Sequence, residues 1–432
     1  MTGPRTAVRN LLVLPPKWGS FQRVAGLGVL QRTLLAAVRA GFVRVVVWAP
    51  TGSAELLELR REDNRLASLE VANEAPASSD AWAVVRSDWV FSPGVLNRLR
   101  EGSAERVQLL AASGVPVGAV GSGEVLLAGL AAGEEQFWSD RSLQRAAVRA
   151  VGSDEVAIPI TSPAAIAEAE KALSRKIWLD TAETDGVLAH WVDRRLSLRM
   201  SRYLVRIRWL RPNHLTVFGT CLGLLAAYLF ARGSYAVSCG GAVLFWVACV
   251  LDGCDGEVAR LTYRDSAWGK VFDVTTDNVV HAAIFLGIGW GALRAHPATV
   301  PLWLPGFLLG GLAFAGAASY VFLHRRPAVQ LAKENAVQGH WFESVLEGLM
   351  NRDFSYLLVV LAFVDRLHWF LWGAAMGSYM VGAMAFVLAA RANHRHEAPT
   401  RQSRLPWEEA PIWEDLGSRN RARCLFDPSS ER

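Results

Sequence analysis

The stretch LDGCDGEVARLTYRDSAWGKVFDVTTD, residues 251–277, decides how this chain is organised. It places four aspartates between apolar segments long enough to cross a bilayer, where an uncompensated charge is costly. They are Asp252, Asp255, Asp273 and Asp277. The first pair is three residues apart and the second pair four apart, so each pair shares one helix face. Crowded carboxylates repel each other unless hard cations such as Mg²⁺ or Mn²⁺ bind between them, so the stretch predicts a metal site.

The residues around these aspartates suit a phosphate-containing ligand. Gly256 and Gly269 remove side chains beside the acids, and Arg260 supplies a forked cation that matches phosphate. A short turn at 261–267 would make the two helices antiparallel neighbours near the inner membrane surface. The alternative, that the acids only pair with arginines, is disfavoured because one motif arginine cannot neutralise four acids. The stretch therefore predicts transfer of a phosphate group.

Composition indicates a chain that is part soluble and part membrane. Its 432 residues leave room for about two or three domains. The hydrophobic content of 52% and mean hydropathy of +0.20 are high for a soluble protein, yet 20% of the residues are charged. The net charge of +5 is modest, and basic residues cluster beside the apolar segments. This pattern favours a membrane surface over nucleic acid as the partner.

Six apolar segments follow one another in the second half of the chain, each near the ~20 residues that a spanning helix needs. They are 214–231, 234–251, 271–293, 301–323, 354–368 and 370–390. Basic residues fall mainly on one side of them. The positive-inside rule then predicts an integral protein of the cytoplasmic (inner) membrane, with both termini and the active site cytoplasmic. The N-terminal apolar run is too short for a signal peptide, which agrees.

The first 150 residues show an α/β pattern. Strands are predicted at 10–14, 43–48 and 82–85, and a helix at 28–41. They make a Rossmann-like βαβ unit, and Asp88 lies just past a strand end, where α/β sheets bind ligands. An alternative for Asp88 is a helix cap or turn residue.

The connector contains a capped helix and an arginine-rich amphipathic stretch typical of a helix lying among lipid headgroups. The expected organisation is two-part, an α/β domain plus an all-α membrane domain of six transmembrane helices. Its segments are 1–150 (α/β domain), 151–210 (connector and juxtamembrane helix), 211–393 (membrane domain) and 394–432 (polar cytoplasmic tail).

The acidic stretch resembles the signature of the CDP-alcohol phosphotransferase (CDP-alcohol phosphatidyltransferase) family. The matching positions are Asp252, two residues, Asp255-Gly256, two residues, Ala259-Arg260, eight residues, Gly269, three residues, Asp273, three residues, Asp277. The RPNHLT stretch, with Asn213 and Thr216, is also similar to the family. The resemblance implies a membrane transferase that moves a substituted phosphate from a CDP-alcohol to a hydroxyl acceptor, with release of CMP, in phospholipid or inositol-phosphate biosynthesis.

The resemblance also implies a role for each residue. Two Mg²⁺ or Mn²⁺ ions would be bound by Asp252, Asp255, Asp273 and Asp277. Asp277 would also be the catalytic general base on the acceptor hydroxyl. The CDP pocket would be lined by Gly256, Ala259, Gly269, Asn213 and Thr216, with Arg260 near the phosphates. The implied partners are the lipid bilayer, the CDP-linked donor, the hydroxyl acceptor and a second copy in a homodimer.

The order of parts resembles the bifunctional inositol-phosphate cytidylyltransferase and di-inositol-phosphate-phosphate synthase proteins. Their first domain is nucleotidyltransferase-like, with a glycine-rich loop for the triphosphate and a metal-binding aspartate at the position of Asp88. Here that loop reads LPPKWGSF, residues 14–21, and prolines lack the N–H groups that cradle phosphate. A degenerate, non-catalytic first domain is therefore expected.

Several alternatives stay open. The first domain would make the CDP-activated donor if it were active, and a membrane transporter would use the acids as an ion site, although no internal repeat supports this. The donor is CDP-diacylglycerol or a soluble CDP-polyol, and the acceptor an inositol phosphate or a lipid-linked alcohol. His281 is expected to be a packed helix residue in preference to a site residue. Arg325 and Arg326 either bind an acceptor phosphate or follow the positive-inside rule.

Overall fold

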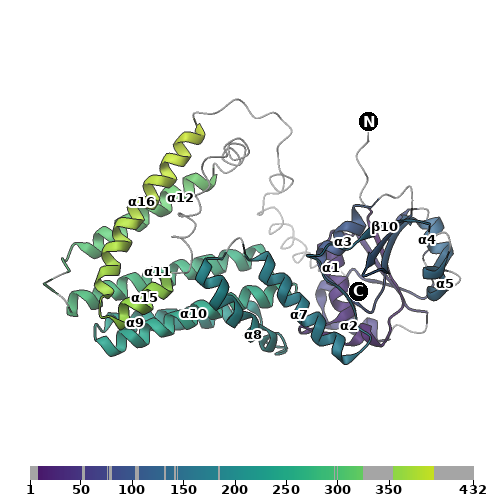
Figure 1. Ribbon diagram of the computed structural model, residues 1–432, viewed down its shortest axis with the longest axis horizontal. Coiled ribbons are helices and arrows are strands. Elements are labelled where there is room, and N and C mark those ends of the chain that lie inside the picture. The colour runs from purple at the N-terminus through teal and green to yellow at the C-terminus, as the bar shows by residue number, and fades with distance from the viewer. Residues whose placement is uncertain are drawn as a thin grey trace, which may run out of the picture. The chain divides into compact units, whose positions relative to one another are not determined.

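The structure is a computed structural model in two compact units. The first comprises Met1–Pro305 with Val345–Leu371, and the second Gly306–Ser344 with Trp372–Arg432. The described residues are 8–324 and 354–393, apart from gaps at 51–53, 75, 77–79, 103–106, 131–132, 141–142, 144, 183–184, 296 and 299. The first unit holds both the α/β domain and the helices that carry the acidic stretch (Figure 1). Arg325, Arg326 and the predicted tail lie outside the described residues.

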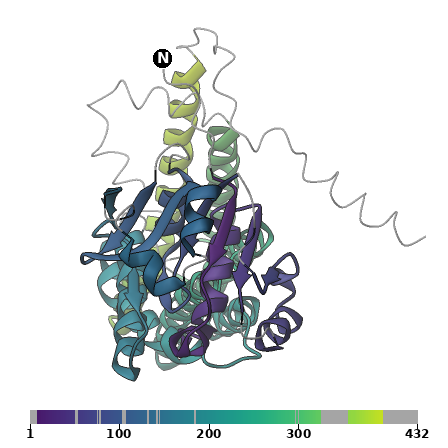
Figure 2. The ribbon, with the colours of Figure 1, turned by 90° about the vertical axis from the view of Figure 1, so that its right-hand side faces the viewer.

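A seven-stranded mixed sheet forms the α/β domain, which faces the viewer in Figure 2. Its order is β10-β8-β9-β6-β1-β4-β5. The strands are β1 (Asn10–Val13), β4 (Arg44–Trp48), β5 (Glu70–Ala72), β6 (Ala81–Val85), β8 (Gln108–Ala112), β9 (Val115–Ser122) and β10 (Ala147–Ala150). Strand β1 pairs in parallel with β4 and β6, whereas β9 runs antiparallel to β6 and β8. The predicted strands and the predicted helix are confirmed.

Helices cover both faces of this sheet because its central strands are apolar on both sides. Along β1, Leu11 and Val13 contribute to one core together with residues of α1 (Val29–Arg39) and α3 (Pro93–Arg100). Leu12 and Leu14 contribute to the opposite core, together with residues of α4 (Gly123–Leu130) and α5 (Glu134–Ser139). The strand's alternation of side chains thus fixes a three-layer domain.

Short elements complete this domain and lead out of it. They are η1 (Trp18–Phe21), the β2–β3 hairpin (Arg23–Val24 and Leu27–Gly28), α2 (Ala54–Glu62), η2 (Asn64–Leu66) and β7 (Trp89–Phe91). In the connector, β11 (Ala157–Pro159) pairs antiparallel with β7. Next comes α7 (Pro163–Asp180), where the Ser162 hydroxyl accepts from the backbone N–H of Ala165 at 3.3 Å and so caps the helix as predicted.

The juxtamembrane segment packs into one continuous core with the α/β domain. It consists of a π-helical turn, η3 (Ala189–Asp193), and α8 (Arg194–Leu204). The core runs from Val24 and Val90 of the α/β domain, through Leu173 of α7 and Leu198 of α8, to Val258 of the next long helix. The α/β domain and the membrane-entry helices are therefore packed directly together within the first unit.

The membrane part is helical, as predicted. Its helices are α9 (Pro212–Ala231), α10 (Tyr235–Leu261), α11 (Ala267–Ala295), α12 (Leu304–His324), α15 (Phe354–Phe363) and α16 (Leu367–Asn393). Among the described residues, α9, α10, α11 and the 367–387 part of α16 are long and apolar enough to span a membrane. The six-span prediction is thus supported for four segments.

The other two predicted spans are shorter apolar helices over the residues described. Residues 304–318 of α12 form one of them, and α15 is the other. Ten residues of α-helix reach about 15 Å, half of a bilayer core. The predicted span 354–368 ends early because Asp365 takes a positive φ of 54° before α16 begins.

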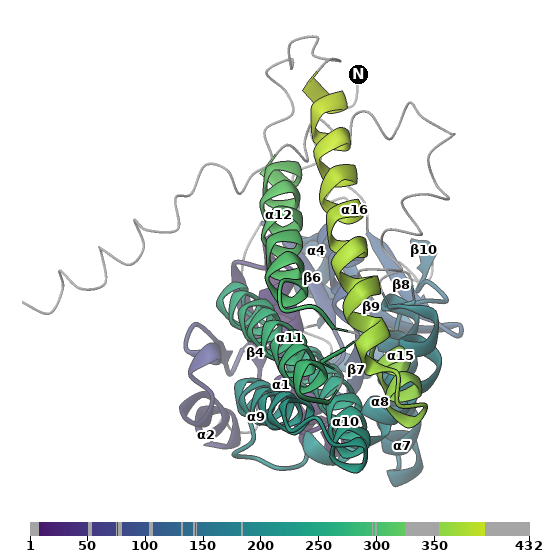
Figure 3. The same ribbon diagram turned by 90° about the vertical axis from the view of Figure 1, so that its left-hand side faces the viewer.

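Close packing of α9 against both α10 and α11 positions the acidic stretch (Figure 3). On α11, a Cβ atom at Gly287 would lie 2.2 Å from the carbonyl oxygen of Ala227, and one at Gly291 would lie 2.1 Å from that of Phe230. Only glycine permits such a close helix crossing, as in other membrane bundles. The crossing holds α11, and with it Asp273, at a fixed place beside α9.

Candidate active site

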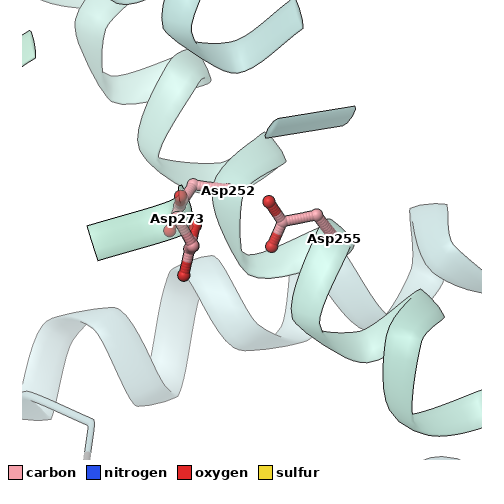
Figure 4. A group of neighbouring side chains, drawn as sticks. All are labelled: Asp252, Asp255 and Asp273. Carbon is pink, nitrogen blue, oxygen red and sulfur yellow. The ribbon is translucent and has the colours of Figure 1, made fainter. Parts of the chain in front are cut away.

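Three of the four predicted aspartates meet at one place. Asp252 and Asp255 project from α10 and Asp273 from α11 (Figure 4). One carboxylate oxygen from each lies within 4.8 Å of the others. Asp255 is buried, whereas the other two are partly exposed. The turn between the two helices is as short as expected, since α10 ends at Leu261 and α11 begins at Ala267.

This cluster fits a hard divalent cation by the chemistry of its donors. Three carboxylates supply oxygen ligands only, which Mg²⁺ and Mn²⁺ prefer. Their mutual repulsion gives an incoming cation a favourable electrostatic field. One or two such cations would be held by Asp252, Asp255 and Asp273. Asp277 remains a prediction as a further ligand.

Residues of α9 support the cluster from one side. Thr216, which is buried, has its hydroxyl in hydrogen-bond contact with the Asp255 carboxylate. This contact fixes the orientation of the Asp255 carboxylate. Asn213 lies near Gly269, where an added Cβ would be 3.9 Å from the asparagine Oδ1. The structure therefore brings both predicted α9 residues to the acidic stretch.

The remaining predicted residues lie along α10. A Cβ at Gly256 would be 3.6 Å from the nearest guanidinium nitrogen of Arg260, so this glycine leaves space beside the exposed cation. Ala259 is 9% exposed and forms part of the packed face. At Gly269, a Cβ would approach the Ser266 hydroxyl to 3.1 Å. The space beside Gly256 and the exposed Arg260 guanidinium suit an anionic group such as the diphosphate of a nucleotide.

Asp277 lies beside a small cavity in the helix bundle. It lines this cavity of about 30 Å³ together with Asp252, Thr216 and His281. The volume has room for about two water molecules. The His281 ring is also packed edge-on against Phe354 at 5.2 Å between ring centroids, so it is a packed helix residue, as expected, whose ring also reaches the cavity.

Sequence analysis did not predict a buried ionic network that joins α8 to α10, the helix that carries Asp252 and Asp255. The Arg194 guanidinium of α8 donates to both Asp185 oxygens at 2.7 and 2.8 Å and to Glu257 Oε1 of α10 at 3.0 Å. Glu257 is fully buried and is also bonded to the Ser197 hydroxyl. Burial alone would lower the pKa of Arg194, but its bonds to Asp185 and the charges of both acids raise the pKa above the usual value. The sequence signal for this network was Glu257, an acidic residue directly after the DGCDG run of residues 252–256.

This network is expected to stabilise the fold strongly. Replacing Arg194 with alanine leaves the buried Glu257 and the partly buried Asp185 without their cation, which costs about 3 kcal/mol in the free energy of unfolding. Thermal unfolding in detergent measures this loss. Arg206→Ala is the matched control, since its bond to Glu170 at 3.1 Å is exposed and worth under about 1 kcal/mol. Equal losses for the two variants would contradict the role given to Arg194.

The loop at 14–21 of the α/β domain is closed by internal contacts. Lys17 pairs with Glu134 at 2.8 Å, and the Ser20 hydroxyl donates to Ser87 at 3.0 Å. A Cβ at Gly19 would lie 2.1 Å from the carbonyl oxygen of Ile160, so the connector covers the loop's glycine. The backbone N–H of Ile160 also donates to the carbonyl of Asp88 at 2.8 Å.

Comparison with known proteins finds a family match within the membrane part. Residues 209–339 match the family model described as CDP-alcohol phosphatidyltransferase. Over these residues the chain is similar to CDP-alcohol phosphatidyltransferases. The matched segment includes every residue from Asn213 to Asp277 that the motif singled out.

Three curated relatives are each similar to a part of the chain. The "Bifunctional IPC transferase and DIPP synthase" of Rubrobacter xylanophilus is 37% identical over 19% of this chain and 18% of its own length. The "Archaetidylinositol phosphate synthase" of Pyrococcus horikoshii is 35% identical over 19% and 42%. The "Phosphatidylinositol phosphate synthase" of Mycobacteroides abscessus is 34% identical over 25% and 47%. The chain thus covers less than half the length of these relatives.

One solved structure is similar to the chain at low identity. It is the inositol-1-phosphate CTP transferase from T. maritima, at 15% identity and a TM-score of 0.31. The similarity covers 40% of this chain and 97% of that one.

Proposed function

We propose that this chain is an integral membrane enzyme that transfers a substituted phosphate from a CDP-alcohol to a hydroxyl acceptor and releases CMP. The observation that carries the proposal is the carboxylate cluster of Asp252, Asp255 and Asp273, formed inside the segment that is similar to CDP-alcohol phosphatidyltransferases. The acceptor class we propose is an inositol phosphate, because the matched relatives are named for inositol phosphate products.

Different residues of the chain have different roles in the proposed reaction. Asp252, Asp255 and Asp273 hold the divalent cation, which when bound neutralises the donor diphosphate and favours departure of CMP. Arg260 binds the phosphates, and Gly256, Ala259, Gly269, Asn213 and Thr216 line the nucleotide pocket. Asp277 takes the proton of the acceptor hydroxyl while that oxygen attacks the phosphorus bearing the alcohol. The new P–O bond forms as the bond to CMP breaks.

The placement in the membrane is part of the proposal. Basic residues of α8 and of the turn between α10 and α11 support a cytoplasmic active site with both termini on the same side. Six spans and a homodimer, as the family resemblance implies, complete the proposed arrangement.

The first domain is proposed not to make the CDP-activated donor. The proline-containing loop lacks N–H donors where a triphosphate would lie. Its lysine, Lys17, is already paired, and Ile160 covers Gly19. The donor therefore comes from a separate reaction that joins CTP to an alcohol phosphate or a lipid phosphate.

The direct test supplies the purified full chain with Mn²⁺, pairs of donors and acceptors, and a CMP assay. We expect CMP from CDP-diacylglycerol or a soluble CDP-polyol only when inositol phosphate is also present, and none after addition of EDTA. With CTP and inositol phosphate alone, we expect no pyrophosphate. Absence of CMP with every pair would overturn the transferase proposal, and pyrophosphate release would overturn the inactive first domain.

A further inference from the structure

The turn that joins the two acidic helices is held by the α/β domain. Five residues, 262–266, separate α10 from α11. Within this turn Tyr263 adopts a φ of 53°, a left-handed conformation that costs a non-glycine residue about 1 kcal/mol or more. Its ring packs against the core of the α/β domain. The backbone N–H of Arg264 donates to the Ala259 carbonyl at 2.9 Å, as in a helix C-cap, and the packing of Tyr263 against the α/β domain adds to this local stabilisation.

Two cations of α1 surround the Tyr263 ring. The guanidinium of Arg32 lies 5.5 Å from the ring centroid and that of Arg39 lies 6.0 Å away, both within cation–π range. Arg39 also forms a bidentate ion pair with Asp265, which lies two residues after Tyr263 in the turn. Helix α1 therefore contacts the turn through both charge and ring packing.

Arg65 of the α/β domain makes the second contact. It donates to the carbonyl oxygens of Thr262 and Tyr263 at 2.9 and 2.8 Å. These carbonyls lie at the C-terminal end of α10, where backbone acceptors lack helical partners and a cation is favourable. Asp63 fixes the guanidinium through bonds of 2.7 and 2.9 Å. Burial alone would raise the pKa of Asp63, but the bonds from Arg65 and Gln31 lower it, so this anchor stays charged.

The position of this turn determines how α10 presents Asp255 relative to Asp273 on α11. We propose that the α/β domain is a positioning device for the metal site, in which Arg39 and Arg65 hold the turn so that the three carboxylates stay within range of one cation. Arg39, Arg65 and Tyr263 are thus positioning residues that touch neither cation nor substrate. The inference rests on the proposed function only in that the aspartates bind a divalent cation.

The test is a charge exchange across the Arg39–Asp265 pair, read by direct Mn²⁺ binding with electron paramagnetic resonance on the full chain. Arg39→Asp and Asp265→Arg are each expected to weaken Mn²⁺ binding about 10-fold, the lower end of the 10–100-fold typical of residues that orient metal ligands. The double exchange should restore binding to within about 2-fold of wild type. Arg65→Met should weaken it similarly, and Arg65→Lys less.

Glu70→Arg is the matched control, because Glu70 pairs with Arg44 at 2.8 Å on the sheet of the same domain, and we expect unchanged Mn²⁺ binding. If the single variants bind Mn²⁺ like wild type, even with a lower melting temperature, the contacts of Arg39 and Arg65 with the turn only stabilise the fold. That result would overturn the inference. Failure of the double exchange to restore binding in a folded protein would do the same. Absence of Mn²⁺ binding by wild type would instead reject the metal site, and with it the proposed function.

Discussion

Asp273→Asn is expected to lower the rate of CMP release about 1,000-fold while leaving the protein folded. Asparagine keeps the size of the side chain but removes the anionic ligand that α11 contributes to the cluster. The cation then has two carboxylates of α10 in place of three, and a loss of about 4 kcal/mol of transition-state stabilisation corresponds to this factor. Part of the rate should return at high Mn²⁺ concentration, because the defect is in metal affinity.

The same substitution lowers activity but is expected to raise the thermal stability of the metal-free protein. Without metal, three close carboxylates repel each other, so Asp273→Asn is expected to raise the melting temperature of the metal-free protein slightly. Added Mn²⁺ should stabilise wild type and have little effect on the variant, since a ligand stabilises only the state that binds it. Asp180→Asn, an exposed carboxylate of α7, is the control. A variant with wild-type activity and Mn²⁺ response would reject the metal-ligand role.

Asp277→Asn is expected to reduce CMP release about 1,000-fold by a different route. A carboxylate that removes a proton in the transition state contributes about 10²–10⁴-fold, and the amide cannot accept that proton. Binding of the CDP-linked donor and of Mn²⁺ should remain close to wild type. High Mn²⁺ should not restore the rate, in contrast to Asp273→Asn.

The measurements are CMP release, donor binding by calorimetry, and Mn²⁺ binding by electron paramagnetic resonance. The position of Asp277 on the wall of a small cavity beside Asp252, with room for water, agrees with a residue that exchanges protons. Normal turnover would remove the base role. A loss of Mn²⁺ binding would instead assign Asp277 as the fourth metal ligand.

Much of the candidate site could be predicted because it depends on local spacing. Asp252 and Asp255 meet because three residues make nearly one helical turn, whatever surrounds the helix. Asp273 was expected beside them because a turn of a few residues makes the next helix an antiparallel neighbour of the first. The strands at 10–13, 44–48 and 81–85 were likewise evident from continuous apolar runs.

Span lengths were harder to predict, since hydropathy does not report backbone dihedral angles. Residues 354–368 are apolar over most of their length, yet α15 ends at Phe363. The break lies at Asp365, whose positive φ belongs to a helix C-cap in which the Arg366 N–H donates to the Leu361 carbonyl at 2.8 Å. A charged pair inside an apolar run, here Asp365 with Arg366, was the sequence signal for this end.

The sequence by itself determined the acidic motif, its helical frame, the α/β pattern of the first domain and the apolar character of the second. Only the tertiary structure decided which distant side chains support the motif. Arg194 meets Glu257 across 63 positions, and Arg39 meets Asp265 across 226. The physical reason is that helix periodicity acts over a few residues, whereas the choice among many arginines as a partner for one carboxylate depends on how whole elements pack.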